Sequence, residues 1–347
     1  MVPASSATSV FNQSGVVAEG WYWVVPGAEL KPGGVRGVRV LGRDLVVWRG
    51  VDGVPHVMDA YCPHMGAHLG EGRVDGTGLR CFFHDWKFDA AGQCVDIPCQ
   101  ERPVPAQVRA WPTAEGLGLI WVWTGAAART PLPHAPELAD VAVDARVAKG
   151  FEKNCHPNVV MVNAIDAQHF NSVHDLPVQL RMERTVLSDH TVVFANTSKV
   201  EERSLLTRFI ARFYRGPLTY AMCYWYGSTG TVTLGPDFLH FYILFALRLG
   251  ESGKTEGQTV LMTRHRSGVI GWLTNRILLG LTGVVGEYFA TGDTRVFQTI
   301  RFDLRTPIKA DQAIVGFIRH FEAQPAVRYG SWEPIAADAA EGAAWGT

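Results

Sequence analysis

The sequence lacks an excess of charge of either sign. Its 347 residues hold 32 Lys and Arg against 33 Asp and Glu, which gives a formal net charge of −1. A nucleic-acid-binding protein needs an excess of basic residues to displace counterions from phosphates. The charge balance therefore removes the electrostatic case for a nucleic-acid partner.

Cysteine is also scarce, with six residues in the whole chain, which is too few for a disulfide scaffold. The first residues, MVPASSATSVFNQSG, lack both the basic start and the apolar run of a signal peptide. We therefore expect a cytoplasmic protein whose reduced thiols can serve as metal ligands.

A long uninterrupted apolar run is lacking too, although residues 268–290 come close. Arg276 and Glu287 divide this stretch, and a spanning helix needs about 20 predominantly apolar residues. We expect no spanning membrane segment, and we interpret the stretch as a mostly buried helix. The alternatives are a flap over a hydrophobic substrate entrance and a surface that touches a membrane.

The sequence does contain the material for a substantial core. Apolar residues make up 47% and aromatic residues 11% of the chain, which excludes disorder over most of its length. At roughly 150 residues per domain, the length indicates about two domains. We predict an N-terminal tail at 1–19, a β-rich domain at 20–125, a linker at 126–150 and a second domain at 151–347.

The second half mixes helical and strand patterns. A helix signal covers 151–174 and ends before Pro177, because proline cannot continue a helix. Long apolar and aromatic strands are predicted at about 186–200, 218–226, 229–234, 238–249 and 257–264, with helices at about 268–290 and 311–324. Antiparallel strands with segregated helices are typical of the α+β class.

Two loops of the first half combine cysteine with histidine. Residues 62–70 read CPHMGAHLG and residues 81–88 read CFFHDWKF. Each loop offers one thiolate and one imidazole, namely Cys62 with His64 and Cys81 with His84. Zinc takes such a set in a tetrahedron, and a Rieske [2Fe–2S] cluster takes two Cys on one iron and two His on the other. The spacing alone leaves both metals open, although zinc fingers usually place both cysteines in one knuckle.

These loops resemble those of the Rieske non-haem iron oxygenases. CPHMGAHLG is similar to the first loop of the branch that oxidises steroids and sterols. The resemblance implies that Cys62, His64, Cys81 and His84 bind a [2Fe–2S] cluster. It also implies a β-rich Rieske domain followed by a helix-grip catalytic domain, in which helices pack on an antiparallel sheet.

The second loop departs from the family at two positions. The family usually has Pro after the second Cys and Gly after the second His, whereas this chain has Phe82 and Asp85. Aspartate tolerates the left-handed backbone region better than most residues. His68 lies outside the ligand spacing and is interpreted as a hydrogen-bonded loop histidine. Respiratory Rieske proteins add a cysteine to each loop, and neither loop has one here.

The second motif is Asp166-x-x-His169-x4-His174. On a helix, Asp166 and His169 share a face. His169 and His174 diverge by about 140° at 3.6 residues per turn, so the helix must end or widen if both are to bind one metal. A π-bulge at Asn171-Ser172 would widen it. Alone, two histidines at this spacing are weak evidence for a site.

Beside a Rieske cluster, this second motif matches the mononuclear iron motif of the family. The resemblance implies that His169 and His174 bind Fe(II) with one later carboxylate, in a facial triad that leaves positions for O₂. The candidates are Glu287, Asp293 and Asp303. We choose Asp293, because family members carry an Asp just before such a helical run; the alternative is that Asp293 is a helix N-cap.

Asp166 has a different role in the family. There the equivalent carboxylate bridges an iron-binding histidine to a cluster histidine of the neighbouring subunit. Carried over, Asp166 would join His169 of one chain to His84 of the next, and the protein would be a homotrimer. The alternative from the residues alone is a buried Asp that caps its own helix.

The resemblance implies the terminal oxygenase of a Rieske system. Electrons would come from a separate NAD(P)H reductase, with or without a ferredoxin, because no G-x-G-x-x-G opens a βαβ unit in this sequence. The protein would hydroxylate, desaturate or oxidatively cyclise a bulky, ring-containing substrate, such as a steroid-like or polycyclic natural product. The rivals are a Rieske-type electron carrier and a zinc-stabilised lipid-binding module.

The predicted strands of the second half suggest the walls of the substrate pocket. Their aromatic residues are Tyr220, Trp225, Tyr226, Phe238, Phe241, Tyr242 and Phe245. Because side chains alternate along a strand, only some of them can face the pocket. A small charged substrate would instead need a cation, for which Arg212, Arg215 and Arg248 are the candidates.

Overall fold

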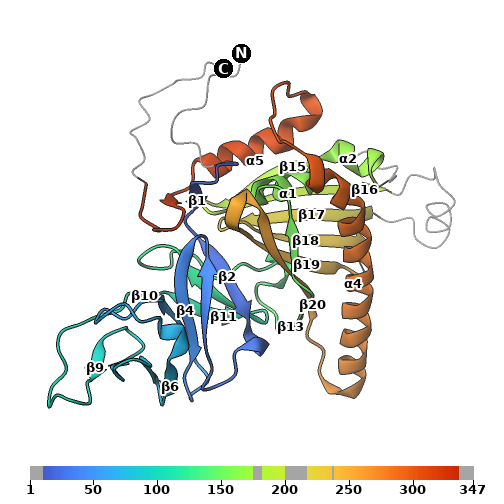
Figure 1. Cartoon of the computed structure of the whole chain (residues 1–347). Helices are drawn as coiled ribbons and strands as arrows, with labels where there is room; N and C mark the ends of the chain where they lie inside the picture. Colours follow the sequence, from blue (N-terminus) through green and yellow to red (C-terminus); the bar gives the residue numbers. More distant parts are fainter. Residues whose placement is uncertain (1–10, 175–181, 200–216, 237, 336–347) are drawn as a thin grey trace.

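The computed structural model describes residues 11–174, 182–199, 217–236 and 238–335. Several small sheets from the first part of the chain lie beside one large sheet with helices from the second part (Figure 1). The predicted α+β class, with a β-rich domain and a sheet-and-helix domain, is confirmed.

The N-terminal domain is built from three small antiparallel sheets. The first sheet contains β3 (Val35–Val40), β4 (Arg43–Arg49), β5 (Pro55–Asp59) and β10 (Ala110–Trp111). The second sheet contains β2 (Trp21–Pro26), β11 (Thr113–Gly116) and β12 (Leu119–Trp123). The third sheet contains β6 (Arg73–Asp75), β7 (Gly78–Arg80), β8 (Lys87–Phe88) and β9 (Cys94–Asp96). A hairpin joins β4 to β5, and Gly53 takes a φ of +84° in its turn, which only glycine adopts readily.

The second domain is one antiparallel sheet with helices. The sheet has the order β13-β20-β19-β18-β17-β16-β15, with β14 also paired to β20. The strands are β13 (Val143–Val147), β14 (Phe151–Lys153), β15 (Glu183–Ser188), β16 (Thr191–Lys199), β17 (Pro217–Trp225), β18 (Thr229–Pro236), β19 (Phe241–Leu249) and β20 (Thr255–Arg264). The predicted linker at 126–150 is therefore only partly a connection, because its last residues form β13.

The helix signal at 151–174 resolves into three shorter elements. The segment begins as strand β14, and it continues as α1 (Pro157–Asn163) and α2 (Ala167–Ser172). His156 caps α1, with Pro157 in its first turn, where the missing N–H costs no hydrogen bond. A single helix over 151–174 was therefore a wrong prediction, because strand pairing with β20 takes the first residues.

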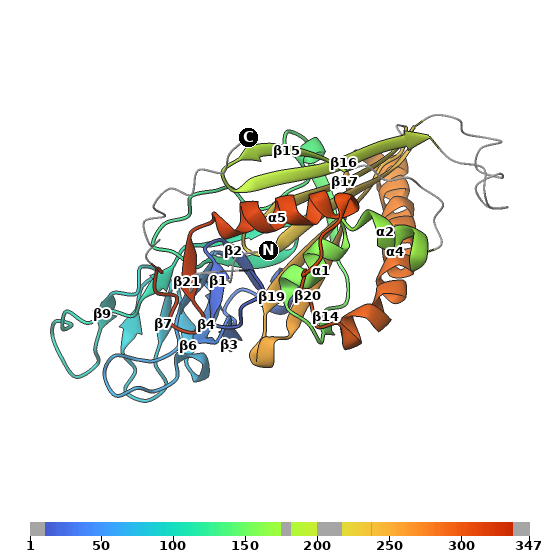
Figure 2. The ribbon, with the colours of Figure 1, turned by 90° about the horizontal axis from the view of Figure 1, so that it is seen from above.

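The two faces of the large sheet contact different partners. Along β19, Ile243 and Leu247 pack in the core formed with α1 and α5 (Gln312–Glu322). The alternate residues, such as Leu244, pack against the tryptophans of β2 and β12. Because side chains alternate along a strand, one face of the sheet meets the helices and the other meets the N-terminal domain. Figure 2 shows α5 lying along the sheet.

The helix α4 (Gly268–Thr299) is longer and more exposed than predicted. It packs on β19 and β20 through one face, where Asn275, Leu279 and Thr282 are buried. Most of its other side chains face solvent, so the prediction that residues 268–290 form a mostly buried helix is wrong. Among the residues that the structure describes, α4 alone has the length and composition to cross a membrane.

The two ends of the described chain meet. β1 (Val16–Ala18) pairs antiparallel with β21 (Ala326–Arg328), so part of the predicted tail at 1–19 is a strand. Beyond β21, Trp332 is 1% exposed. It contacts Trp111 of the N-terminal domain, with ring centroids 4.7 Å apart. The C-terminal segment thus completes the core of the N-terminal domain.

Candidate metal centres

The two Cys-His loops have the same backbone geometry. In the first loop, Gly66 N donates to Cys62 O, and Cys62 N donates to Ala67 O. In the second loop, Asp85 N donates to Cys81 O, and Cys81 N donates to Trp86 O. Four residues after each cysteine, the backbone takes a positive φ, +75° in the first loop and +60° in the second. Each loop is therefore the same tight turn.

Asp85 takes the left-handed backbone conformation in the second loop that Gly66 takes in the first. Its φ of +60° lies in the left-handed region, which Asp enters more easily than most residues. Its carboxylate pairs with Arg73 at 2.5 Å and with Arg80 at 3.5 Å. Arg80 also donates to the Asp85 carbonyl oxygen. These contacts hold the turn without glycine, and they explain how the loop accommodates its departure from the family.

The four side chains of these loops divide by burial. Cys62 and Cys81 are 3% and 2% exposed, and their thiols hydrogen-bond to each other. Burial raises the pKa of Cys62 to about 11, so a bound metal is needed to hold this residue as a thiolate at neutral pH. His64 and His84 are exposed, with ring centroids 4.6 Å apart. Two inner sulfurs and two outer imidazoles fit a cluster with one Cys-bound and one His-bound iron.

His68 takes the structural role expected of it. Its Nδ1 accepts from Gly70 N at 3.0 Å and caps the short helical turn Leu69–Glu71. Its ring also lies against Gly37, where a Cβ would approach Cε1 at 2.6 Å. These contacts occupy the ring and leave His68 outside the ligand set.

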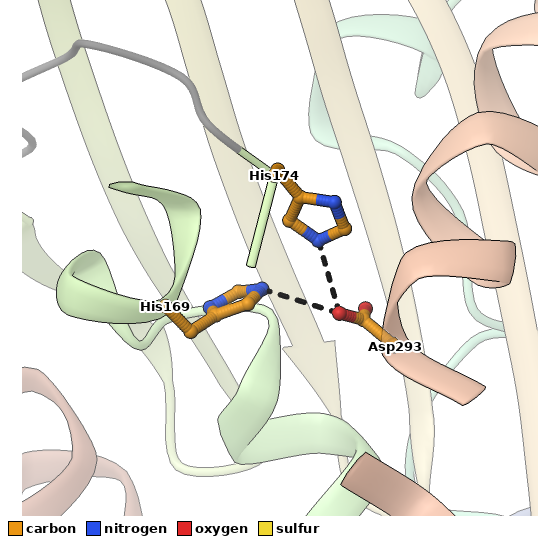
Figure 3. Close-up of side chains that lie close together, drawn as sticks. All are labelled: His169, His174 and Asp293. Carbon is orange, nitrogen blue, oxygen red and sulfur yellow. Dashed lines mark ion pairs between the residues drawn. The ribbon is translucent and has the colours of Figure 1, made fainter. Parts of the chain in front are cut away.

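The second site brings together three side chains from two elements. His169 lies in α2, His174 follows the end of α2, and Asp293 lies on α4 (Figure 3). Asp293 Oδ1 is 2.9 Å from His174 Nε2 and 3.6 Å from His169 Nε2. One donor atom of each residue lies within 4.8 Å of the other two. Asp293 is inside the helix, so the N-cap alternative is wrong.

The end of α2 allows both histidines to face one point. The helix stops at Ser172, and Val173 caps it through a bond to His169 O. His174 therefore leaves the helical path before the 140° divergence would carry it away. The structure uses helix termination rather than a π-bulge at Asn171-Ser172.

The three side chains fit a mononuclear iron. Apart from each other at 2.9 Å, the buried atoms His174 Nε2 and Asp293 Oδ1 have no hydrogen-bond partner, and such atoms are costly unless a ligand satisfies them. Burial lowers the pKa of His174, which favours the neutral imidazole that metals need. His169 Nδ1 lies 2.7 Å from Asp166 O, so this ring nitrogen donates and Nε2 is left for the metal. Two imidazoles and one carboxylate are the donor set of non-haem Fe(II) sites.

Asp166 caps α2 within its own chain. Its Oδ1 accepts from Gln168 N at 2.9 Å and from His169 N at 3.4 Å. Its side chain is half-buried. The carboxylate and the carbonyl of this one residue therefore fix both the helix start and the His169 ring. One carboxylate oxygen, Oδ2, makes none of these bonds.

The other two carboxylate candidates lie elsewhere. Asp303 pairs with Arg305 at 2.5 Å on the surface. Glu287 is exposed on α4, one and a half turns before Asp293, and it lines the cavity described next. Neither belongs to the group formed by His169, His174 and Asp293.

A cavity of about 700 Å³ adjoins the three donors. Its walls are mostly apolar and come from α1, α2, α4 and the helix-facing side of the sheet. They include Phe170, Met222, Val232, Leu234, Ile243, Phe245, Leu247, Leu261, Phe289 and Phe297. This volume lies within the range of about 300–1,000 Å³ typical of small-molecule pockets.

Only two of the predicted aromatic wall residues line this cavity, namely Tyr220 and Phe245. Burial raises the pKa of Tyr220, whose hydroxyl donates to Ala164 O at 2.6 Å. The other five do not line it, namely Trp225, Tyr226, Phe238, Phe241 and Tyr242, so the expectation that only some of these residues face the cavity is confirmed. Trp225 and Tyr242 face the opposite side of the sheet, as strand alternation requires, where Trp225 donates to His134 O.

Arg248, one of the predicted cationic candidates, does not line the cavity either. Arg248 binds Glu256 at 2.7 Å and the Trp23 carbonyl oxygen at 3.0 Å, and it stacks on the Trp23 ring. It therefore joins the two domains. Arg212 and Arg215 lie outside the described residues.

Sequence reasoning missed three polar residues at the site. Asn163 Nδ2 lies 3.4 Å from His169 Nε2. Lys153 lines the cavity and donates to Thr294 Oγ1 at 3.2 Å. Tyr288 donates to His174 O at 3.2 Å and holds the backbone of that ligand. Only the position of Asn163, six residues before His169, gave any signal in the sequence.

Comparisons with known proteins agree with this geometry. Residues 20–112 match the family described as the Rieske [2Fe-2S] domain. The chain is 41% identical over 160 residues to cholesterol 7-desaturase nvd of Bombyx mori, a match that covers 45% of this chain and 35% of that protein. It is 34% identical over 166 residues to the oxygenase component of 3-ketosteroid-9-alpha-monooxygenase of Rhodococcus rhodochrous, covering 45% and 43%. Each match thus spans less than half of the relative.

The fold comparison extends over the whole chain. Apo dicamba monooxygenase superposes with a TM-score of 0.63 and 21% identity, covering 91% of this chain and 97% of that one. This likeness shows the fold of both domains. The family match also decides between the two metals left open by the Cys-His spacing, in favour of iron–sulfur. The resemblance drawn from the two loops is thereby confirmed: residues 20–112 form a Rieske [2Fe-2S] domain, and the chain is similar in sequence to a cholesterol 7-desaturase and to the oxygenase component of a 3-ketosteroid monooxygenase.

Proposed function

We propose that this protein is the terminal oxygenase of a Rieske system and oxidises a bulky apolar, ring-containing substrate. The observation that carries the proposal is the position of His169, His174 and Asp293 at the wall of a large apolar cavity. Fe(II) held by these residues would supply O₂ activation, with electrons from the cluster held by the two Cys-His loops. An electron carrier would have no use for such a cavity.

The residues of this chain define how a substrate would be held. Apolar side chains exclude water and bind the rings, since burial stabilises by roughly 25 cal/mol per Å² of apolar surface. Asn163 and Lys153 are the polar groups that can orient a hydroxyl or keto oxygen. The matched relatives are named for cholesterol and 3-ketosteroids, which supports a sterol or steroid-like substrate. Hydroxylation, desaturation and oxidative cyclisation are all compatible with this arrangement.

The remaining parts of the proposal concern partners. We infer that a separate NAD(P)H reductase, with or without a ferredoxin, reduces the cluster, because the Rhodococcus relative is named as an oxygenase component. We also infer a cytoplasmic homotrimer in which Asp166 bridges His169 to His84 of the next subunit. The exposure of His84 and the half-buried Asp166 support this pairing.

The test combines spectroscopy with turnover. Purified protein should be red-brown, show the EPR signal of a reduced Rieske cluster, and contain additional mononuclear iron. With a reductase and O₂, it should convert a member of a panel of sterols and 3-ketosteroids. A colourless protein with stoichiometric zinc in the loops would identify the zinc-stabilised lipid-binding module instead. A Rieske signal without mononuclear iron and without turnover would identify an electron carrier.

A further inference from the structure

The outer face of α4 exposes a row of large apolar side chains. They are Val269, Ile270, Trp272, Leu273, Ile277, Leu281, Val284 and Tyr288, and they are between 47% and 84% exposed. Single exposed apolar residues are ordinary on protein surfaces, whereas a contiguous apolar patch usually marks an interaction site. The outer face of α4 is therefore a candidate interaction surface.

The way α4 packs determines how it could meet that partner. Asn275, Leu279 and Thr282 are buried against the sheet, opposite the exposed row. A helix that crossed a membrane would have to leave the sheet and open the cavity. A helix that lies flat can keep these contacts and present its other face, which is the arrangement of an interfacial amphipathic helix.

The charge of this face is mostly basic. Between residues 264 and 286 the chain carries Arg264, His265, Arg266 and Arg276 and has no acidic residue, and the exposed Glu287 follows at the far end of the row. All four basic residues are exposed, and the Arg276 guanidinium lies 4.9 Å above the Trp272 ring. The Asp144 carboxylate is engaged by His265 and Asn275. Basic side chains beside tryptophan are typical of surfaces that meet anionic lipid headgroups.

The apolar row is continuous with the mouth of the cavity. Val284 belongs to both, since it is 68% exposed and also lines the cavity. Gly280 and Gly283 line the cavity on the same helix and present no side chain that could close it. On the strand edge, the exposed Arg146 and Lys149 line the cavity, and Arg146 donates to Leu279 O of α4. The helix side of the rim is thus mostly apolar, with the exposed Glu287 as its acidic residue, and the strand edge is basic.

We propose that the outer face of α4 docks on an anionic lipid bilayer, with the helix lying in the interface. Substrate dissolved in the bilayer then enters the cavity between α4 and β13 without crossing water. A second copy of this chain is a poorer occupant, because a two-fold contact would place the basic groups of the two faces against each other. Delivery of substrate rests on the proposed function, whereas docking does not.

Vesicle flotation of the full chain tests the docking. The protein should float with vesicles of phosphatidylcholine mixed with phosphatidylglycerol, bind phosphatidylcholine alone more weakly, and lose binding as salt rises. The double variant Ile270→Ser and Ile277→Ser removes two exposed side chains that do not line the cavity, and it should weaken binding at least about tenfold. Arg276→Gln should weaken binding to the mixed vesicles about fivefold.

A matched control removes apolar side chains elsewhere. Val51→Ser and Leu187→Ser together alter two residues that are 66% and 51% exposed, far from α4 in the sequence, and should float as the wild type does. An unchanged cluster spectrum shows that each variant is folded. Turnover of a sterol delivered in cyclodextrin should be unchanged in the α4 variants, whereas turnover of vesicle-borne sterol should fall.

Two results would overturn the proposal. Wild-type protein that floats with neither vesicle at low ionic strength has no membrane-docking face. A wild-type oligomer that the double variant converts to smaller species, measured by light scattering, would assign the face to a second copy instead. Flotation without any sterol turnover would leave the docking supported and remove the proposed function.

Discussion

The two candidate metal centres differ most in their exposure. At the tip of the N-terminal domain, the two imidazoles are exposed and the two thiols are buried. At the second site, His169 and His174 are 7% and 5% exposed, and the donors open onto a cavity rather than onto the surface. Under the proposed function, the exposure of the first centre would allow electron exchange with another protein, and the enclosure of the second would exclude water from a bound substrate.

The largest effect is expected from the loss of the cluster. Cys81→Ser removes one of the two buried sulfur ligands, so the red-brown colour and the Rieske EPR signal should disappear, and turnover with them. Mononuclear iron should remain, because its three donors lie in the other domain. Parallel iron analysis and EPR measure both. If Cys81→Ser also emptied the second site, the two centres would not be independent.

The converse variant tests the enclosed centre. His174→Ala should abolish product and mononuclear iron binding while the cluster spectrum stays intact, and Asp293→Ala should act in nearly the same way. Iron analysis with single-turnover product assays checks this. Normal iron content and rate in Asp293→Ala would move the third ligand to another carboxylate, with Glu287 and Asp303 as the next to test.

Asp166→Asn tests whether the two centres communicate between subunits. The amide can still cap α2, and the backbone carbonyl still orients His169, so both metals should be retained. If the carboxylate bridges to His84 of the next subunit, transfer from the reduced cluster should slow by about 10–100-fold, as rapid-mixing absorbance would show. A merely capping carboxylate would leave that rate unchanged.

Mixing two inactive variants tests directly whether electrons pass from the cluster of one subunit to the iron site of the next. His84→Ala chains mixed with His169→Ala chains should regain activity after exchange, because some interfaces then pair an intact cluster with an intact iron site. Mixed trimers without any recovery would place electron transfer within one chain. A monomer in solution would remove the bridge altogether.

Two glycines of α4 offer a smaller, matched test. A Cβ at Gly292 would lie 2.8 Å from His174 Cε1, whereas a Cβ at Gly280 would meet nothing within 4 Å. Gly292→Ala should therefore displace the ligand ring and weaken iron binding by about 10–100-fold. Gly280→Ala should instead stabilise the fold by about 0.4–1 kcal/mol. Metal titration and thermal unfolding separate the two, and equal iron affinity in both would show that the ring yields without cost.

The smallest effect is expected at Asp85. Asp85→Gly relieves the strain of a φ of +60° but removes partly exposed ion pairs, which are worth about 0–1 kcal/mol. The two contributions nearly cancel, so cluster content and unfolding temperature should hardly change. Asp85→Val cannot adopt this φ easily and should lower both. A stable Asp85→Val protein would show that the loop does not need the left-handed conformation.

The sequence allowed the metal ligands to be named because the two Cys-His loops and the His169–His174 motif resemble those of a known family; the spacing alone left the metals open. The sequence did not allow the orientation of strand residues to be predicted. Trp225 and Tyr242 carry the same aromatic signal as Tyr220 and Phe245, and only the strand register decides which face each occupies. The exposure of α4 was also beyond prediction, since apolar composition does not distinguish a buried helix from one that meets another apolar phase.

The pairing of β1 with β21 has a consequence for biosynthesis. Trp332 donates to Leu41 O across a sequence separation of 291 residues, and it fills a core that also contains Trp111 and Val17. The N-terminal domain leaves the ribosome long before the residues that complete it. Until translation reaches β21, that core exposes apolar surface, and such nascent chains depend on chaperones. The N-terminal domain therefore completes its core only after β21 and Trp332 have been synthesised.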